Sequence, residues 1–246
     1  MPAFKNIYYI HFDSIDSTNT WTKNHAHTLD PQKITCITAL EQTAGRGRGA
    51  HKWISPKGEN IYASIYFTIP LHSPYIVNLA QIASLSCARL LKLEGLHPQI
   101  KWPNDILVDG KKIAGTLVET VSFEDKIGIV LGIGINVNMS QEHLDAIDQP
   151  ATSLAALTHC SWDKDAILSL FLKEFLVNLE CLKTEGFAYF ISDYEAMLAY
   201  KGEKITCSDQ GKTIEGICLS IDSLGRLHIE LPSGEILKLY SGTVRK

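Results

Sequence analysis

This sequence lacks the excess of basic residues that is typical of proteins that bind nucleic acids. Its 23 lysines and arginines are outnumbered by 27 aspartates and glutamates, and the formal net charge is −4. Proteins bound to phosphate backbones usually carry a basic surface, so the composition disfavours a DNA-binding function. No stretch of 18 apolar residues occurs, and the N-terminus lacks the pattern of a signal peptide. We therefore expect neither a transmembrane helix nor a membrane partner.

Paired cysteines are lacking too. None of the six cysteines forms a CxxC pair, and several lie in apolar stretches such as ITCITAL and EGICLSI. This usage predicts buried free thiols in a reducing compartment, hence a cytoplasmic protein. Internal repeats and low-complexity segments are also missing, whereas 45% of the 246 residues are hydrophobic. The chain is therefore long and apolar enough for one large globular domain, or for a large domain and a small one.

Hydrophobic spacing predicts alternating strands and helices over the first four-fifths of the chain. Asp109-Gly110 is a strong hairpin signal between two apolar runs. The almost wholly apolar segment 127–138 predicts a central strand. The expected strands are 7–13, 34–41, 61–69, 99–102, 106–121 and 127–138. A first helix is expected to begin at the capping signal around Ser17, and three more are expected over 76–94, 163–185 and 187–198.

The pattern changes after Tyr200, where short alternating strands are separated by turns such as 209–211, 222–225 and 233–234. A segment of this size suits a small five-stranded barrel. We therefore predict two domains, a larger one over residues 1–198 and a small β domain over 199–246.

A glycine-rich segment is the first candidate for chemistry. Gly45, Gly47 and Gly49 alternate with Arg46 and Arg48. Glycines let a backbone approach a ligand, and two arginines can grip a phosphate or a carboxylate. The segment lacks the ending of a Walker loop and the GxGxxG spacing, so alone it is equally consistent with a mobile solvated loop.

Two further segments hold polar residues at strand ends. KWPND (101–105) ends a predicted strand, and Lys112 follows the hairpin turn. GIGINVN (132–138) combines two glycines with Asn136 and Asn138. Taken singly, Lys112 could be a solvated lysine and Asp105 a turn former.

Together, and in this order, DSTN (16–19), EQTAGRGRGAHKWISPKGEN (41–60), KWPNDILVDGKKIAGTLVE (101–119) and GIGINVN resemble the biotin protein ligases. The resemblance spans nearly the whole chain. It implies an α/β fold, with a mixed, largely antiparallel sheet flanked by helices and a C-terminal SH3-like β-barrel.

The resemblance also implies a two-step reaction. Biotin and ATP with Mg²⁺ give biotinyl-5′-AMP and pyrophosphate. A lysine of the biotin carboxyl carrier protein of acetyl-CoA carboxylase, or of a related carboxylase, then takes up the biotin. A lipoate or octanoate ligase or transferase of the same fold, and a non-catalytic biotin-binding protein, are the alternatives.

Site roles follow from the same resemblance. Lys112, Arg48 and Asp105 correspond to catalytic positions, and Asp105 would either bind Mg²⁺ or orient the acceptor lysine. The biotin-binding positions are Ser17, Thr18, Asn19, Gln42, Arg46, Gly47, Arg48 and Lys112. The ATP and adenylate positions are Arg46, Arg48, Trp53, Asn104, Lys112 and Asn136.

The match has two notable departures. Gly49 directly follows Arg48, whereas many relatives have another residue between them, and His51 stands where a basic residue is usual.

Some relatives carry an N-terminal helix-turn-helix domain. Since DSTN begins at residue 16, we expect the short, non-regulatory type without specific DNA binding. The sequence leaves open whether the protein is a monomer or a homodimer.

Overall fold

The computed structural model describes residues 7–209 and 211–246, which form two compact units. The first unit contains residues up to 74 together with 110–173, and the second contains 75–109 and 174–246. Gln210, within the predicted turn at 209–211, lies outside the described residues.

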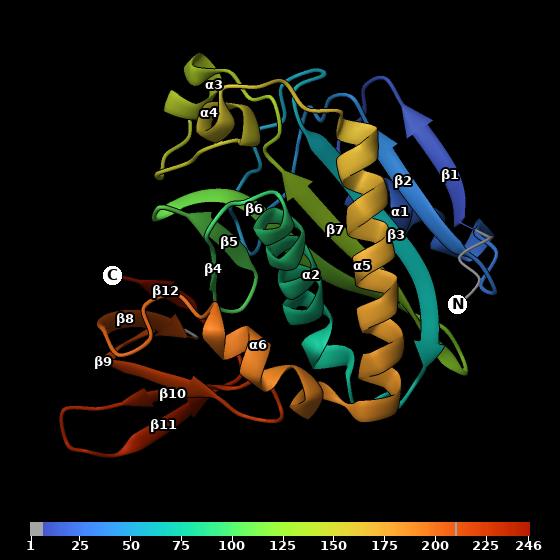
Figure 1. Cartoon of the computed structure of the whole chain (residues 1–246). Helices are drawn as coiled ribbons and strands as arrows, with labels where there is room; N and C mark the ends of the chain where they lie inside the picture. The colour runs from blue at the N-terminus through green and yellow to red at the C-terminus, as the bar shows by residue number, and fades with distance from the viewer. Residues whose placement is uncertain (1–6, 210) are drawn as a thin grey trace. The chain divides into compact units, whose positions relative to one another are not determined.

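A mixed sheet forms the framework of the first unit. Within this unit the strand order is β1-β2-β3-β7-β6, and among these strands, as far as the structure describes them, only the β1–β2 pair is parallel. Antiparallel pairing therefore predominates, as expected. The strands are β1 (Ile7–Phe12), β2 (Ile34–Ala39), β3 (Ile61–Pro70), β6 (Lys111–Ser122) and β7 (Lys126–Ile135) (Figure 1).

Strand β7 lies between β3 and β6, which confirms the prediction of a central strand. Helix α1 (Thr18–His25) contacts β3 and β7, and the short helix η1 (Ala26–Thr28) follows it. Tyr66 and Val130 form part of the core beneath these helices. Two short helices of this unit, α3 (Gln141–Asp145) and α4 (Leu154–Thr158), were not predicted because each is barely one turn long.

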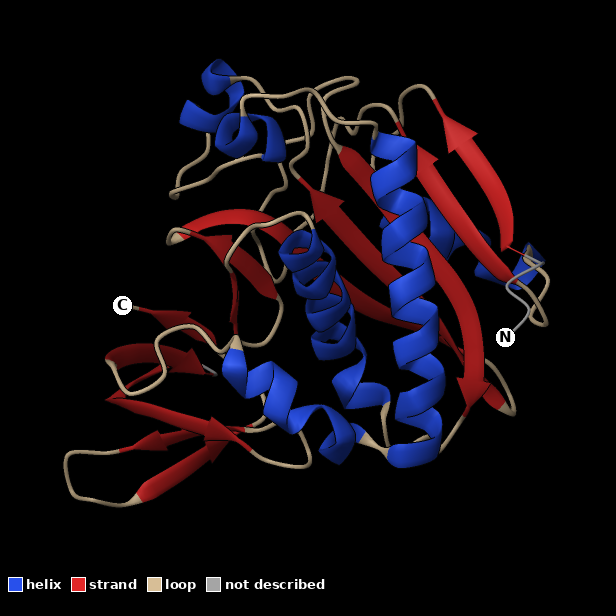
Figure 2. Ribbon diagram, in the orientation of Figure 1, coloured by secondary structure: helices blue, strands red, loops and turns tan. Residues whose placement is uncertain are grey.

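The second unit has a buried helix, a hairpin and an antiparallel sheet (Figure 2). Helix α2 (Leu79–Leu93), preceded by η2 (Ile76–Asn78), contacts β4 (Pro98–Lys101) and β5 (Asp105–Val108). By length and composition Ile76–Leu93 could span a membrane, but 67% of it is buried within the protein, as is usual for a core helix. Helix α5 (Lys164–Glu185) continues from the first unit, and η3 (Phe187–Phe190) and α6 (Ile191–Ala196) follow it.

The C-terminal strands form one five-stranded antiparallel sheet in the order β11-β10-β9-β8-β12. The fifth strand is the short C-terminal segment β12, which the sequence pattern did not separate from β11. The strands are β8 (Lys204–Asp209), β9 (Lys212–Ile221), β10 (Leu227–Glu230), β11 (Ile236–Leu239) and β12 (Thr243–Arg245).

Two local predictions can be compared directly. Asp109 and Gly110 both have positive φ angles, 51° and 74°, as a hairpin turn of type I′ requires.

The prediction that all the thiols are buried is wrong for two of them, because Cys160 is exposed and Cys181 is half-buried. Cys36, Cys87, Cys207 and Cys218 are buried.

Candidate active site

The N-terminus of α1 contributes three residues to the candidate site in the first unit. Ser17 is the N-cap residue, and its hydroxyl accepts a hydrogen bond from the backbone N–H of Thr20. Such a cap satisfies a backbone donor that the helix leaves unpaired. Ser17, Thr18 and Asn19 are all nearly fully buried. The DSTN segment therefore starts a helix and places three polar side chains inside the protein.

Gln42 is held in one orientation by its neighbours. Its Oε1 accepts hydrogen bonds from the backbone N–H of Thr18 (2.9 Å) and from the Thr18 hydroxyl (3.2 Å). Its Nε2 donates to Ser55 Oγ at 3.0 Å, and Ser55 Oγ in turn donates to the Trp53 carbonyl at 2.9 Å. The structure brings Thr18 and Gln42 together, two residues expected to bind biotin, and it adds Ser55, which was not among the expected site residues.

Asn19 is ordered by residues of three strands. Its Oδ1 lies 2.5 Å from the hydroxyl of buried Ser64 on β3, and its Nδ2 donates to Glu119 on β6 at 3.1 Å. On β7, a Cβ at position 132 would collide with the Asn19 amide, so Gly132 is needed for this close approach.

Glu119 is the charged centre of this region. Lys23 donates to its carboxylate at 2.8 Å, and Arg46 donates to it at 3.1 Å. Partial burial alone would raise the pKa of Glu119, but the hydrogen bonds from Lys23 and Asn19 and the charges of Arg46 and Lys23 lower it overall. Glu119 is therefore ionised at neutral pH and holds Arg46 next to Asn19.

The glycine-rich segment forms a small hairpin. Gly45 O accepts from Trp53 N (2.9 Å), and Gly47 N donates to His51 O (2.8 Å). These backbone hydrogen bonds and the Arg46–Glu119 ion pair hold the segment in place, which the sequence, equally consistent with a solvated loop, does not predict. Gly49 has a φ of 64° at the tip, so the glycine shifted relative to many relatives occupies a left-handed turn position.

Trp53 connects the hairpin to Lys112. The Trp53 ring lies against Gly134 of β7, where a Cβ would collide with it, and Lys112 Nζ lies 5.2 Å from the ring centroid. Lys112 and the Trp53 ring therefore form a cation–π contact. The indole Nε1 of Trp53 is buried and has no hydrogen-bond partner among the described residues.

Lys112 stands at the start of β6, where its backbone pairs with the segment 150–152. Its N–H donates to Pro150 O, and its carbonyl accepts from Thr152 N. Asn136 is 2% exposed, and its Nδ2 donates to the Thr152 carbonyl at 3.0 Å. Asn136 thus supports the backbone beside Lys112, and its predicted contact with the adenylate stays a prediction.

Asn104 and Asp105 belong to the second unit, at the start of β5. Asp105 is 9% exposed. Its carboxylate forms an ion pair with Lys101 (Nζ–Oδ2, 3.0 Å) and accepts a hydrogen bond from Asn104 Nδ2 (3.3 Å). Within residues 7–209 and 211–246, no group of three or more His, Cys, Asp or Glu is placed to hold a metal ion.

Comparison with known proteins identifies the family. The Biotin/lipoate A/B protein ligase family matches residues 11–136. The bifunctional ligase/repressor BirA of Bacillus spizizenii is 33% identical over 240 residues, which cover 96% of this chain and 73% of that protein. This chain belongs to the biotin/lipoate protein ligase family.

Other family members agree in sequence and in fold. The biotin–[acetyl-CoA-carboxylase] ligase of Mycobacterium tuberculosis is 30% identical over 214 residues, covering 85% of this chain and 77% of that enzyme. The solved biotin protein ligase from Aquifex aeolicus in complex with biotin and ATP has 30% identity and a TM-score of 0.81, with 98% of each chain covered. The expected α/β fold with a mixed sheet is therefore confirmed.

Proposed function

We propose that this ligase activates biotin with ATP and transfers it to a lysine of a biotin carboxyl carrier protein. One observation supports this most directly. A continuous line of contacts runs from Thr18 and Gln42 through Ser55 to Trp53, and then to Lys112. The polar groups expected to bind biotin are thereby joined to those expected to bind the adenylate.

In the first step, a carboxylate oxygen of biotin attacks the α-phosphorus of ATP, and the bond to pyrophosphate breaks. Thr18, Asn19 and Gln42 offer both donors and acceptors, which suits the ureido ring of biotin. Lys112 places a fixed positive charge beside Trp53. That charge would stabilise the negative charge that develops on the transferring phosphoryl group.

In the second step, the amine of the acceptor lysine attacks the acyl carbon of biotinyl-5′-AMP. The new amide bond forms, the bond to AMP breaks, and the amine loses a proton. Arg46 and Arg48 lie on the hairpin at 45–53, from which they would cover the adenylate. Water exclusion by such a cover would protect a mixed anhydride from hydrolysis.

Mg²⁺ would enter with ATP as part of the substrate. Protein sites for this ion typically use one or two carboxylates together with substrate phosphates. Asp105 offers one carboxylate, already balanced by Lys101. This carboxylate would either exchange Lys101 for the metal or orient the acceptor lysine.

Three further properties are proposals. The six free thiols support a reducing, cytoplasmic location. The net charge of −4 supports an enzyme without specific affinity for DNA. The acceptor is proposed to be the carrier protein of acetyl-CoA carboxylase or of a related carboxylase, because the relative from Mycobacterium tuberculosis is named for that substrate.

The test is incubation with MgATP, labelled biotin and a biotin carboxyl carrier domain. The expected result is label on the acceptor lysine that requires ATP and disappears when that lysine is replaced by arginine. Lipoate and octanoate are tested in parallel, since the family includes ligases of lipoate. Transfer of octanoate or lipoate without transfer of biotin would refute the proposal.

A further inference from the structure

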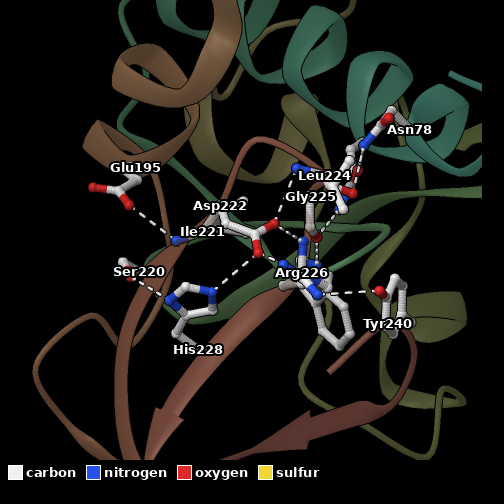
Figure 3. A network of polar contacts seen from close by, with 12 residues as sticks. Asn78, Glu195, Ser220, Ile221, Asp222, Leu224, Gly225, Arg226, His228 and Tyr240 are labelled. Atoms are coloured by element: carbon white, nitrogen blue, oxygen red, sulfur yellow. Dashed lines mark hydrogen bonds and ion pairs between the residues drawn. The ribbon is translucent and has the colours of Figure 1, made fainter. Parts of the chain in front are cut away.

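The turn between β9 and β10 is built around Asp222 (Figure 3). Asp222 Oδ1 accepts hydrogen bonds from the backbone N–H groups of Leu224 and Arg226, both at 3.0 Å. Its Oδ2 accepts from Arg226 Nε at 2.6 Å and lies 3.2 Å from His228 Nε2. A single carboxylate therefore determines the conformation of the whole turn.

This turn presents one carbonyl to two buried side chains. The carbonyl of Gly225 accepts from Trp102 Nε1 at 2.9 Å and from Gln81 Nε2 at 2.6 Å. Gly225 has a φ of 76°, and a Cβ there would collide with Gln81 and Asn78. Any other residue would strain the backbone at this φ and push the two side-chain amides aside.

Trp102 lies two residues before Asn104 and three before Asp105, the residues expected to act at the phosphates or at the amine. It is 2% exposed, and the hydrogen bond to Gly225 fixes the direction of its indole ring. The ion pair between Lys101 and Asp105 encloses the same short segment, which spans 101–105. Trp102, Asn104 and Asp105 therefore share one five-residue segment, which a hydrogen bond holds at Trp102 and an ion pair holds at its two ends.

We propose that Trp102 is a positioning residue, and that the Asp222–Arg226 turn of the C-terminal sheet places Asn104 and Asp105 for catalysis by binding the Trp102 indole. This inference rests on the proposed function. It gives the small β-sheet a part in the reaction, because the carbonyl that orients the motif belongs to the turn that connects β9 and β10.

The test compares two variants that each remove one donor to the same carbonyl. Trp102→Phe removes the donor in the motif, and Gln81→Met removes the donor on α2. Both should lower the melting temperature. Trp102→Phe should lower kcat about 10- to 100-fold, because small displacements of reacting groups have effects of this size. Gln81→Met should change kcat by less than about threefold, and both should retain the affinity of the wild type for biotin.

A double-mutant cycle with Asp105→Asn separates positioning from general destabilisation. If Trp102 acts through Asp105, the double variant Trp102→Phe/Asp105→Asn is no slower than Asp105→Asn alone. Multiplicative losses, an unchanged kcat in Trp102→Phe, or an equal loss in Gln81→Met would each overturn the inference. An inactive wild-type enzyme would instead count against the proposed function.

Discussion

At the scale of single residues, Glu119 shows how one carboxylate can order several ligand-binding groups. Its contacts reach Asn19, Lys23 and Arg46, each of which lies more than 70 positions from Glu119 in the sequence. None of these contacts was predicted, although Glu119 belongs to a recognisable motif. The periodicity of a strand gives the face on which a side chain lies, but not the partner that tertiary packing brings to it.

We predict that Glu119→Gln weakens biotin binding about 5- to 30-fold, because a neutral amide no longer holds Arg46 and Lys23. Isothermal titration with biotin measures the change in affinity. Asp125→Asn, at an exposed turn position, is the control and should bind normally. Unchanged affinity in Glu119→Gln would show that Arg46 and Asn19 do not need this carboxylate.

Lys112 provides the second prediction for a single residue. Lys112→Ala should remain folded but lose about 30- to 1000-fold in the rate of biotinyl-AMP synthesis, since a charge that stabilises the transition state is removed. Pyrophosphate exchange measures that rate. The exposed neighbour Lys111 is the matched control, and Lys111→Ala should react like the wild type. Nearly normal exchange by folded Lys112→Ala would remove Lys112 from the mechanism.

At the scale of elements, the hairpin at 45–53 combines fixed and adjustable parts. Its backbone hydrogen bonds and the contact of Trp53 with Gly134 define a folded element. Gly45 and Gly47 make these hydrogen bonds, Gly49 forms the tip, and the side chain of Arg46 is exposed enough to move. Such an element can act as a cover with little change in its own fold.

We predict that Arg48→Gly still makes biotinyl-5′-AMP but releases it early, because a cover without this cation binds the adenylate less tightly. Released adenylate acylates exposed lysines of other proteins. Biotin label on added albumin is the measurement, with the wild type and Lys52→Gly run beside it. Equal retention of the adenylate by Arg48→Gly and the wild type would show that the hairpin is not a cover.

The Asp222 turn is the element with the clearest dependence on pH. Burial would raise the pKa of Asp222, but the hydrogen bonds from Arg226 and His228 lower it to about 2. Since this pKa is lower in the folded than in the unfolded state, the stabilisation is complete above about pH 4. It disappears as the pH falls from about 4 to 2.

We therefore predict that Asp222→Asn destabilises the protein at neutral pH by about 1 kcal/mol, after allowance for screening by solvent. Its melting temperature should also fall less steeply than that of the wild type below pH 4. Calorimetry between pH 2 and 7 tests both statements. Parallel curves for the two proteins would mean that Asp222 is not tightly hydrogen-bonded.

The elements themselves were largely predictable, whereas their contacts were not. Alternating and helical spacing located the strands of the main sheet and the helices α1, α2 and α5. The hydrogen bond from Trp102 to Gly225 joins residues 123 positions apart. No local pattern encodes such a contact, so the support behind the KWPND segment emerged only from the structure.

At the scale of the whole molecule, charge is the property that bears on its partners. Acidic residues exceed basic ones by four, which disfavours binding to a phosphate backbone. A bifunctional ligase/repressor is nevertheless among the relatives. The balance of charge and this relationship therefore point in different directions, and an experiment must decide between them.

We predict no saturable binding of this chain to a biotin-operon operator, with or without biotin and ATP. A mobility-shift titration at moderate salt is the measurement, and a bifunctional relative serves as the positive control. Sub-micromolar binding that survives added salt would contradict the prediction, because unspecific electrostatic binding weakens steeply as salt increases.

Gly132 and Gly134 of β7 each lie against one side chain of the site, so substitutions at these glycines depend on the residue that each one contacts. Any side chain at 132 would collide with Asn19, and any at 134 with Trp53. A descendant of this chain could thus acquire a larger residue at either position only together with a smaller partner. Across a lineage, we expect positions 19 and 132, and positions 53 and 134, to vary as pairs.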